Sequence, residues 1–376
     1  MTSGATPSET ATVTAPRAAQ NPNIHGLRGL AALMVFLFHV YDMSVTSDVI
    51  TEAALPARIA LQALSGGVEL FFMISGYLIT GSLLRHANIK NFLIDRAIRI
   101  YPVFLALHIP LFLAAPFLGY KWLTGIGIGA WLQAFVANAL FLPGIFDLPL
   151  LQLNAWSLSY EATFYLLSAL IYFMAAKQLP MRNTITACLI GCAILLYPTA
   201  GYFLVGAVTY KLLHSKQPPT LSIPRLMPVL ALLAVLCLHG FVTSIDRGVR
   251  GPTLDFSLSH LHLLGILPGW VFFMGLTRGG SLFDGILRHR ISQYLGDISY
   301  SFYLIHPVVM FPLRLVMIKI IIGKLGLPVW LGITCFGVFG LVGTLIAATI
   351  SYRLLERGLG RWLKQQLHRP LASVVT

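Results

Sequence analysis

Charged residues are scarce in this sequence of 376 residues. They make up 10% of the chain, whereas a soluble domain carries roughly 25%. Negative charge is the scarcer sign, with 13 Asp and Glu against 26 Lys and Arg. Hydrophobic residues make up 57%, the mean hydropathy is +0.79, and long apolar runs recur from about residue 26 to 354. These features exclude a soluble domain and predict an all-α, polytopic membrane protein, because continuous rather than alternating apolar runs argue against a barrel.

Cysteine is also scarce, and residues 1–23 lack the apolar segment of a signal peptide. The four cysteines, Cys188, Cys192, Cys237 and Cys335, all fall inside apolar runs with no His or acid beside them, so we predict small core residues and no metal site. Residues 1–23 are rich in Thr, Ala, Ser and Pro and have no apolar core segment. We predict a disordered cytoplasmic tail rather than a signal peptide.

The basic residues that are present lie mainly in short connections between apolar runs. This is the positive-inside pattern of membrane proteins, so the net charge of +13 does not indicate nucleic-acid binding. Residues 85–99 and the tail 359–376 are both basic, which predicts that both termini are cytoplasmic and that the number of spans in the domain 24–358 is even. We predict ten spans, with 123–142 as a non-spanning apolar helix on the outer side. The spans are 25–44, 66–84, 101–119, 156–176, 184–198, 200–214, 224–243, 259–277, 297–318 and 328–354.

An arginine and a histidine lie inside the first predicted span. Arg28 and His39 are eleven residues apart, which on an α-helix places them on one stripe about 16 Å apart in depth. Burial of such groups is costly, so each needs a partner or a function. Asp42 follows His39 by three residues and either holds its imidazole or caps the outer end of the span.

Polar residues recur at helical spacing in three later segments. Glu69 begins an apolar block and either enters the bilayer from the outer side or reaches the interface. Two stripes follow, each readable as structural or functional: Ser157, Glu161 and Tyr165 in "WSLSYEATFY", and Ser299, Tyr303 and His306 in "GDISYSFYLIHP". His306 precedes Pro307, so a structural histidine at a helix kink is an alternative to a catalytic one.

Arg96 and Arg99 lie three residues apart in "NFLIDRAIRIYP" and therefore share a helix face. They either bind lipid phosphates at the cytoplasmic interface or clamp a soluble phosphate-bearing donor. Together with Arg28, His39 and the acids near the opposite face, they mark a path across the bilayer. A group donated from inside to an acceptor outside is the simplest use of such a path.

Five blocks in order give the chain a family resemblance. "HGLRGLAALMVFLFHV", "GGVELFFMISGYLI", "RAIRIYP", "WSLSYEATFY" and "GDISYSFYLIHP" resemble motifs of the acyltransferase 3 family over roughly residues 23–360, although Glu69 stands where the family often has Asp. The resemblance implies ten core helices and transfer of an acyl group, commonly acetyl, from cytoplasmic acyl-CoA to a carbohydrate outside, with no bound cofactor. Arg28 and His39 match the family's functional pair, and Arg96 and Arg99 match its cytoplasmic arginines.

These matches give a set of expected roles. His39 is the expected base or acylated nucleophile, and Arg28 binds the CoA arm. Some members of the family carry a fused C-terminal esterase-like domain. We expect none in this protein, which should then act alone or with a partner protein, and we expect it to lie in a bacterial inner membrane. The full prediction is catalysis by His39, Glu69 and Asp42; donor binding by Arg28, Arg96, Arg99 and Ser75; and acceptor or supporting roles for Trp156, Ser157, Glu161, Tyr165, Ser299, Tyr303 and His306.

Two other functions would use the same residues. A secondary transporter would use the intramembrane His, Glu and Arg set as a proton relay, but its expected inverted repeats are not visible. An inactive scaffold would have lost the histidine or the arginine pair, and both are present. The acceptor is open among O-antigen, exopolysaccharide, a lipochitin oligosaccharide and a macrolide sugar.

Overall fold

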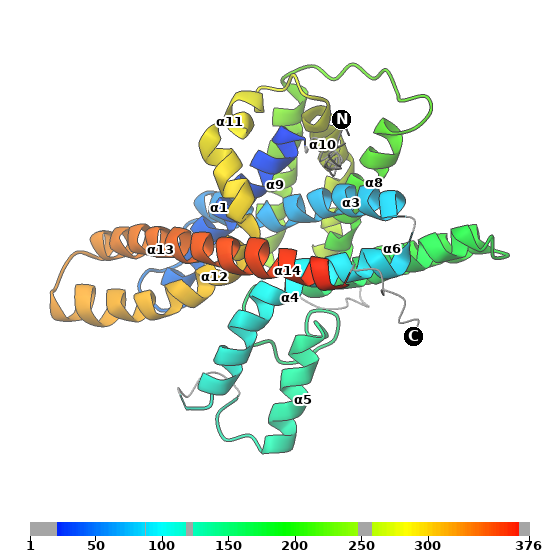
Figure 1. Ribbon diagram of the computed structural model, residues 1–376. Helices are drawn as coiled ribbons and strands as arrows, with labels where there is room; N and C mark the ends of the chain where they lie inside the picture. The colour runs from blue at the N-terminus through cyan, green and yellow to red at the C-terminus, as the bar shows by residue number, and fades with distance from the viewer. Residues whose placement is uncertain (1–20, 87, 118–122, 247–257, 368–376) are drawn as a thin grey trace, which may run out of the picture.

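The computed structural model describes residues 21–86, 88–117, 123–246 and 258–367. Helices dominate these residues and none of them forms a β-strand, which confirms the all-α prediction (Figure 1). The predicted tails lie largely outside the described residues. The helices are α1 (Pro22–Val45), α2 (Leu55–Ala63), η1 (Leu64–Gly66), α3 (Gly67–His86), α4 (Ile89–Ala114), α5 (Ile128–Ala139), α6 (Ala155–Ala176), α7 (Arg182–Leu196), η3 (Pro198–Ala200), α8 (Gly201–Leu213), α9 (Met227–Ile245), η4 (Leu258–Gly265), α10 (Ile266–Arg278), α11 (Asp284–Arg288), α12 (Arg290–Val316), η5 (Met317–Lys324), α13 (Val329–Ser351), η6 (Tyr352–Leu359) and α14 (Gly360–Leu367).

Eight helical stretches among the described residues are long and apolar enough to cross a membrane. They coincide with eight of the ten predicted spans, and they confirm a multi-pass membrane protein. The other two predicted spans are the 15-residue helix α7 and the 13-residue helix α8, which are shorter than the ~20 residues of a full crossing. The count of ten therefore stays a prediction that depends on these two helices.

The predicted non-spanning helix is α5, which has only 12 residues. In Figure 1 it lies beside the lower part of α4. Three hydrogen bonds join the two helices, including the Tyr101 hydroxyl to the Ala139 carbonyl at 3.1 Å and the Trp131 indole to the Phe112 carbonyl at 3.3 Å. A helix of this length is shorter than a full crossing, and its place outside the membrane-crossing set stays a prediction.

Helix α4 begins twelve residues before the predicted span. The side chain of Asn88 caps it by accepting a hydrogen bond from the Asn91 amide, and the helix continues without a break through Arg96 and Arg99. The predicted span starts at residue 101 because it follows hydropathy, whereas backbone hydrogen bonding extends the helix through the charged turn before it. Both arginines therefore project from the same helix as the predicted span.

Helix α1 is central, and it packs closely against α12 and α3. A Cβ on Gly29 would lie 2.7 Å from the Gly296 amide nitrogen, so glycine is required for this close approach of α1 and α12. Small residues serve membrane helices in this way, because lipid supplies no hydrophobic drive and packing contacts must. The side chains of His39 and His306 belong to these two helices and meet as a result.

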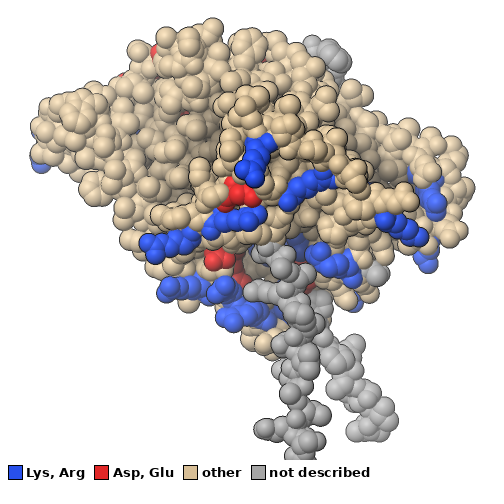
Figure 2. All heavy atoms as spheres, turned by 90° about the horizontal axis from the view of Figure 1, so that it is seen from above, with Lys and Arg blue, Asp and Glu red and all other residues tan. Residues whose placement is uncertain are grey.

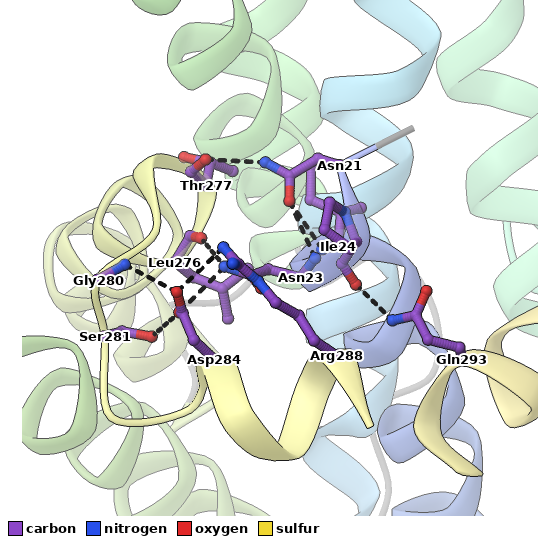
Figure 3. A network of polar contacts seen from close by, with 11 residues as sticks. Asn21, Asn23, Ile24, Leu276, Thr277, Gly280, Ser281, Asp284, Arg288 and Gln293 are labelled. Atoms are coloured by element: carbon purple, nitrogen blue, oxygen red, sulfur yellow. Dashed lines mark hydrogen bonds and ion pairs between the residues drawn. The ribbon is translucent and has the colours of Figure 1, made fainter. Parts of the chain in front are cut away.

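A polar network fixes the start of α1 against α10, α11 and α12 (Figure 3). Asn21 caps α1 and donates to the Thr277 carbonyl at 2.8 Å, while the Asn23 amide donates to Asp284 at 3.1 Å. The Arg288 Nε–H donates to Asn23 at 2.8 Å and the guanidinium also pairs with Asp284 at 3.1 Å. Because Arg28 lies one to two turns beyond this network, the network sets its depth.

The exterior is apolar over most of its area, and the cysteine prediction fails there. Cys188, Cys192 and Cys237 are exposed and Cys335 is partly exposed. In a bilayer the surroundings are as apolar as the core, so apolar residues need not turn inward. Lys and Arg side chains form a band across the lower part of Figure 2, while the upper part of that face carries little charge.

Candidate active site

Two polar cavities lie inside the bundle. The first, which we call the arginine cavity, has a volume of about 60 Å³ and is lined by polar residues of α1, α3, α4, α6 and α12. The second, which we call the histidine cavity, has a volume of about 300 Å³. The polar residues of the arginine cavity are Arg28, Ser75, Arg96, Arg99, Ser157, Glu161, Ser299, Tyr300 and Tyr303; those of the histidine cavity include His39, Asp42, Gln62, Ser65, Glu69, Asn154, Trp156, Tyr160, His239, Asp246, Ser259, His262 and Tyr303.

Val68 and Tyr303 line both cavities, so the two are adjacent. The Tyr303 hydroxyl lies 2.9 Å from Ser157 Oγ. Since Ser157 already donates to the Asn154 carbonyl at 2.9 Å, Tyr303 is the donor in this pair. The Tyr303 ring, held by this hydrogen bond, thus separates the arginine cavity from the histidine cavity.

Three arginines and one carboxylate face the arginine cavity. Arg28 is only 9% exposed, and both Glu161 and Glu356 are close enough to interact electrostatically with Arg28 and Arg99. Arg96 donates to Ser82 at 3.3 Å, but its buried Nε has no hydrogen-bond partner in the described part of the chain. Three cations against two carboxylates leave an excess of positive charge that suits an anionic ligand.

A wider cleft of about 630 Å³ continues from the arginine cavity, because Arg96 and Arg99 line both. We call it the basic cleft. Its cations outnumber its acids, and Lys364 reaches Asp95 at 2.9 Å across its mouth. The charged residues of the basic cleft are Asp95, Arg96, Arg99, Glu356, Arg357, Arg361 and Lys364.

His39 and His306 are hydrogen-bonded across α1 and α12, with 3.0 Å between His39 Nδ1 and His306 Nε2. His306 Nδ1 lies 3.1 Å from the Phe302 carbonyl, which can only accept, so this nitrogen carries a proton. The neutral His306 ring then accepts at Nε2, and His39 donates from Nδ1. Nε2 is therefore the basic nitrogen of His39, and the residue is placed as a candidate base of the histidine cavity.

Pro307 contributes to this arrangement because it leaves one backbone carbonyl of α12 without its helical hydrogen bond. Proline has no amide proton, so the carbonyl of Tyr303, four residues earlier, lacks its helical donor. Asn154 supplies one, donating to that carbonyl at 2.7 Å, and its amide nitrogen also lies 3.4 Å from His306 Nε2. The histidine before Pro307 is thus part of the site as well as of the kink.

Glu69 is buried, with 1% exposure, and does not reach the interface, so that alternative is wrong. Its Oε1 lies 3.2 Å from His239 Nδ1, and this nitrogen lies 3.2 Å from His262 Nε2. Neither histidine was among the predicted site residues, although each is an ionisable residue inside a predicted span. That signal alone could have identified them.

The predicted groups of residues separate between the cavities. All four predicted donor-binding residues line the arginine cavity, and all three predicted catalytic residues line the histidine cavity. Tyr165 and His306 line neither, but Tyr165 donates to Glu161 at 2.6 Å and Ser75 donates to the same oxygen at 3.0 Å. Asp42 lies in the histidine cavity beside His39, whose Nδ1 is bonded to His306.

Comparisons with known proteins show the family of this chain. The sequence model of the acyltransferase 3 family, described as an acyltransferase domain, matches residues 21–351. Acyltransferase MdmB of Streptomyces mycarofaciens is 30% identical over 175 residues, which cover 45% of this chain and 43% of that protein. The match thus spans less than half the length of that relative. No solved structure matches the chain. Since the family match covers nearly all of the described helices, including both cavities, this chain belongs to the acyltransferase 3 family.

Proposed function

We propose that this protein is a membrane O-acyltransferase that moves an acyl group, acetyl by expectation, from acyl-CoA to a hydroxyl of an extracytoplasmic glycan such as O-antigen or exopolysaccharide. One observation carries the proposal. A cationic cavity and an imidazole-rich cavity meet at Tyr303 and Val68, in a protein of a membrane acyltransferase family. Such a pair allows a donor and an acceptor to approach from different sides.

The donor side is the basic cleft and the arginine cavity. CoA carries phosphates, and hydrogen bonds between ionised partners are about twice as strong as neutral ones. Arg96 and Arg99 line both spaces, so they can contact phosphates while the thin pantetheine arm enters toward Arg28. The small volume of the arginine cavity, about 60 Å³, favours a short acyl group.

The acceptor side is the histidine cavity. A sugar hydroxyl is a poor nucleophile, so a base must take its proton as the oxygen attacks the thioester carbonyl. His39 takes this proton at Nε2, while its Nδ1–H remains hydrogen-bonded to His306 Nε2. The tetrahedral intermediate then collapses, the ester forms, the C–S bond breaks, and the proton passes from His39 to the CoA thiolate. Transient acylation of His39, followed by attack of the hydroxyl on the acyl-imidazole, is the alternative sequence.

The orientation follows from charge. Basic residues gather at one part of the surface (Figure 2), and cytoplasmic segments of membrane proteins are the ones enriched in Lys and Arg. We therefore assign the basic cleft and both termini to the cytoplasm of a bacterial inner membrane. Acyl-CoA and a carbohydrate are then the partners.

The test uses glycans from a strain that lacks this gene. Ester-linked acyl groups should be absent from one cell-surface glycan, return with the wild-type protein, and stay absent with His39→Gln at equal protein level. Inverted membrane vesicles, which expose the cytoplasmic face, should use added acyl-CoA, whereas right-side-out vesicles should not. A deletion strain with unchanged glycan esters, or a proton-coupled solute flux in the same vesicles, would contradict the proposal and favour the transporter.

A further inference from the structure

A second cluster in the histidine cavity has not been assigned a role. It consists of Glu69 in α3, His239 in α9 and His262 in η4, all of them buried. Their nearest oxygen and nitrogen atoms lie within 4.8 Å of one another. We propose that these three side chains bind a divalent transition-metal ion of the zinc class.

The positions of the protons carry the argument. His262 Nδ1 lies 2.8 Å from the Ser259 carbonyl, which can only accept, so the proton of this neutral ring is on Nδ1 and Nε2 has a lone pair. Ser65 uses its hydroxyl proton on the Gln62 carbonyl at 2.7 Å, so it must accept from His239 Nε2 at 2.8 Å. The neutral His239 ring therefore presents a lone pair at Nδ1.

Three electron-rich atoms thus converge. His239 Nδ1 lies 3.2 Å both from His262 Nε2 and from Glu69 Oε1, and with neutral rings no proton stands between them. In addition, Glu69 Oε2 is buried and has no hydrogen-bond partner among the residues that the structure describes. Lone pairs that face one another in a low-dielectric interior repel unless a cation lies among them.

The separations fit a metal ion. Zinc bonds histidine nitrogen and carboxylate oxygen at ~2.0–2.2 Å, so neighbouring ligand atoms at tetrahedral angles lie about 3.3–3.5 Å apart. The two separations of 3.2 Å are close to this. Two histidines and a glutamate are also a known ligand set of catalytic zinc, which keeps a fourth position for water or substrate.

The surroundings supply the remaining features of such a site. Ser65 and the Ser259 carbonyl each hold the non-ligating nitrogen of one histidine, which fixes the orientation of both rings. The cluster borders the cavity of about 300 Å³ that also contains His39. If the proposed function holds, the fourth position is where an acceptor hydroxyl can bind and lose part of its proton affinity, with His39 as the base.

Metal content can be measured without reference to activity. The full-length protein, purified without a histidine tag, would be stripped with a chelator, titrated with Zn²⁺ or Co²⁺, and analysed by elemental analysis and visible spectroscopy. We expect one tight equivalent per chain and the absorption of four-coordinate cobalt. His239→Gln, His262→Gln and Glu69→Gln should each abolish this equivalent, and Ser65→Ala should weaken it by about 10–100-fold.

His260→Gln is the matched control. His260 is buried, lies two residues from His262, and has its Nε2 2.9 Å from the Leu195 carbonyl, outside the cluster. It should keep one equivalent. A wild-type protein without a tightly bound metal equivalent would overturn the proposal in favour of a proton shared by the two rings and Glu69. An equal loss of metal in His260→Gln would also overturn it, as would retention of metal in the three ligand variants. Intact acyl transfer by the metal-free protein would support the proposed function. Metal binding without acyl transfer would support the metal site and contradict the proposed function.

Discussion

The two cavities hold their polar groups in different ways. In the histidine cavity, hydrogen bonds orient three imidazole rings: His39 bonds to His306, His239 bonds to the Ser65 hydroxyl, and His262 bonds to the Ser259 carbonyl. In the arginine cavity, charged side chains converge with fewer fixed contacts, and a buried nitrogen of Arg96 has no hydrogen-bond partner among the described residues. The first arrangement fixes where protons are, whereas the second supplies an excess of positive charge.

This difference indicates different tasks. A group that exchanges a proton must be oriented before its substrate arrives, because misplacement by about 1 Å can cost 10²-fold in rate. A group that binds an anion needs charge more than direction, and buried cations are stabilised when the anion enters. Substitutions in the two cavities should therefore change different kinetic constants, and the following predictions test that separation.

The largest effect is expected for His39→Gln. Glutamine keeps much of the volume and a hydrogen-bonding group but cannot take a proton, so kcat should fall by about 10²–10⁴ with the KM for acyl-CoA unchanged. Transfer assays in membranes at several donor concentrations would measure both. His108→Gln is the matched control, since His108 is equally buried and bonds the Phe135 carbonyl at 3.2 Å away from both cavities. Substantial activity in His39→Gln would move the catalytic role to another residue.

The next effect is expected for His306, which orients His39 without lining the cavity. His306→Ala removes the acceptor of the His39 Nδ1–H bond, and we expect a loss of about 10²-fold in kcat. His306→Gln retains an acceptor and should restore part of that loss. A pH–rate profile distinguishes this role from a structural one, because a positioning residue should shift the profile of His39. Equal losses in both variants with an unchanged profile would contradict the positioning role of His306.

A smaller effect is expected for Arg99 and Arg96, and it should fall on the donor alone. A hydrogen bond to a charged group contributes ~1.5–3 kcal/mol, so Arg99→Gln should raise the KM for acyl-CoA by about 10–150-fold at similar kcat. Arg353→Gln, at an exposed arginine outside both cavities, is the control. Added salt should weaken donor binding less in the variant than in the wild type. An unchanged donor KM would assign the arginine pair to lipid phosphates.

Several features of the candidate site could be predicted from residue spacing within single helices. The eleven-residue spacing of Arg28 and His39 places them on one stripe of α1, and the structure confirms one continuous helix across both. The stripe from Ser157 to Tyr165 was also visible, and Tyr165 does bond Glu161 at 2.6 Å. Such patterns depend only on helical geometry, which sequence spacing determines.

Contacts between helices could not be read in this way. His239 and His262 meet Glu69 although more than 160 residues separate them from it in the chain, and Asn154 bonds the Tyr303 carbonyl from 149 residues away. Which faces of two spans meet is decided by close packing at residues such as Gly29 and Gly296. The prediction that the cysteines are buried core residues was wrong for a related reason. Lipid surrounds the helices, so apolar residues do not sort into an inside and an outside as they do in a soluble protein.

The smallest effect is expected at the start of α1, which carries residues of both cavities. Burial raises the pKa of Asp284, but hydrogen bonds from the Gly280 amide and the Ser281 hydroxyl, with Arg288, hold this pKa below its ordinary value. A depressed pKa stabilises the folded state at pH values above the ordinary range of aspartate, about 3.9, and this stabilisation is lost as pH falls through the folded pKa. Asp284→Asn should therefore lower the apparent midpoint of thermal unfolding by about 1–2 °C at neutral pH, and by less as the buffer becomes more acidic.

This variant should change both sides of the comparison together. Asp284 anchors Asn23, and a looser start of α1 shifts Arg28 and His39 as one rigid helix (Figure 3). We expect modest, parallel changes in donor KM and kcat, in contrast to the separate effects of the arginine and histidine variants. Asp147→Asn, at an exposed loop residue, should change neither the unfolding midpoint nor the kinetics. A change in donor KM alone would show that the network acts on the arginine cavity and not through the helix that the two cavities share.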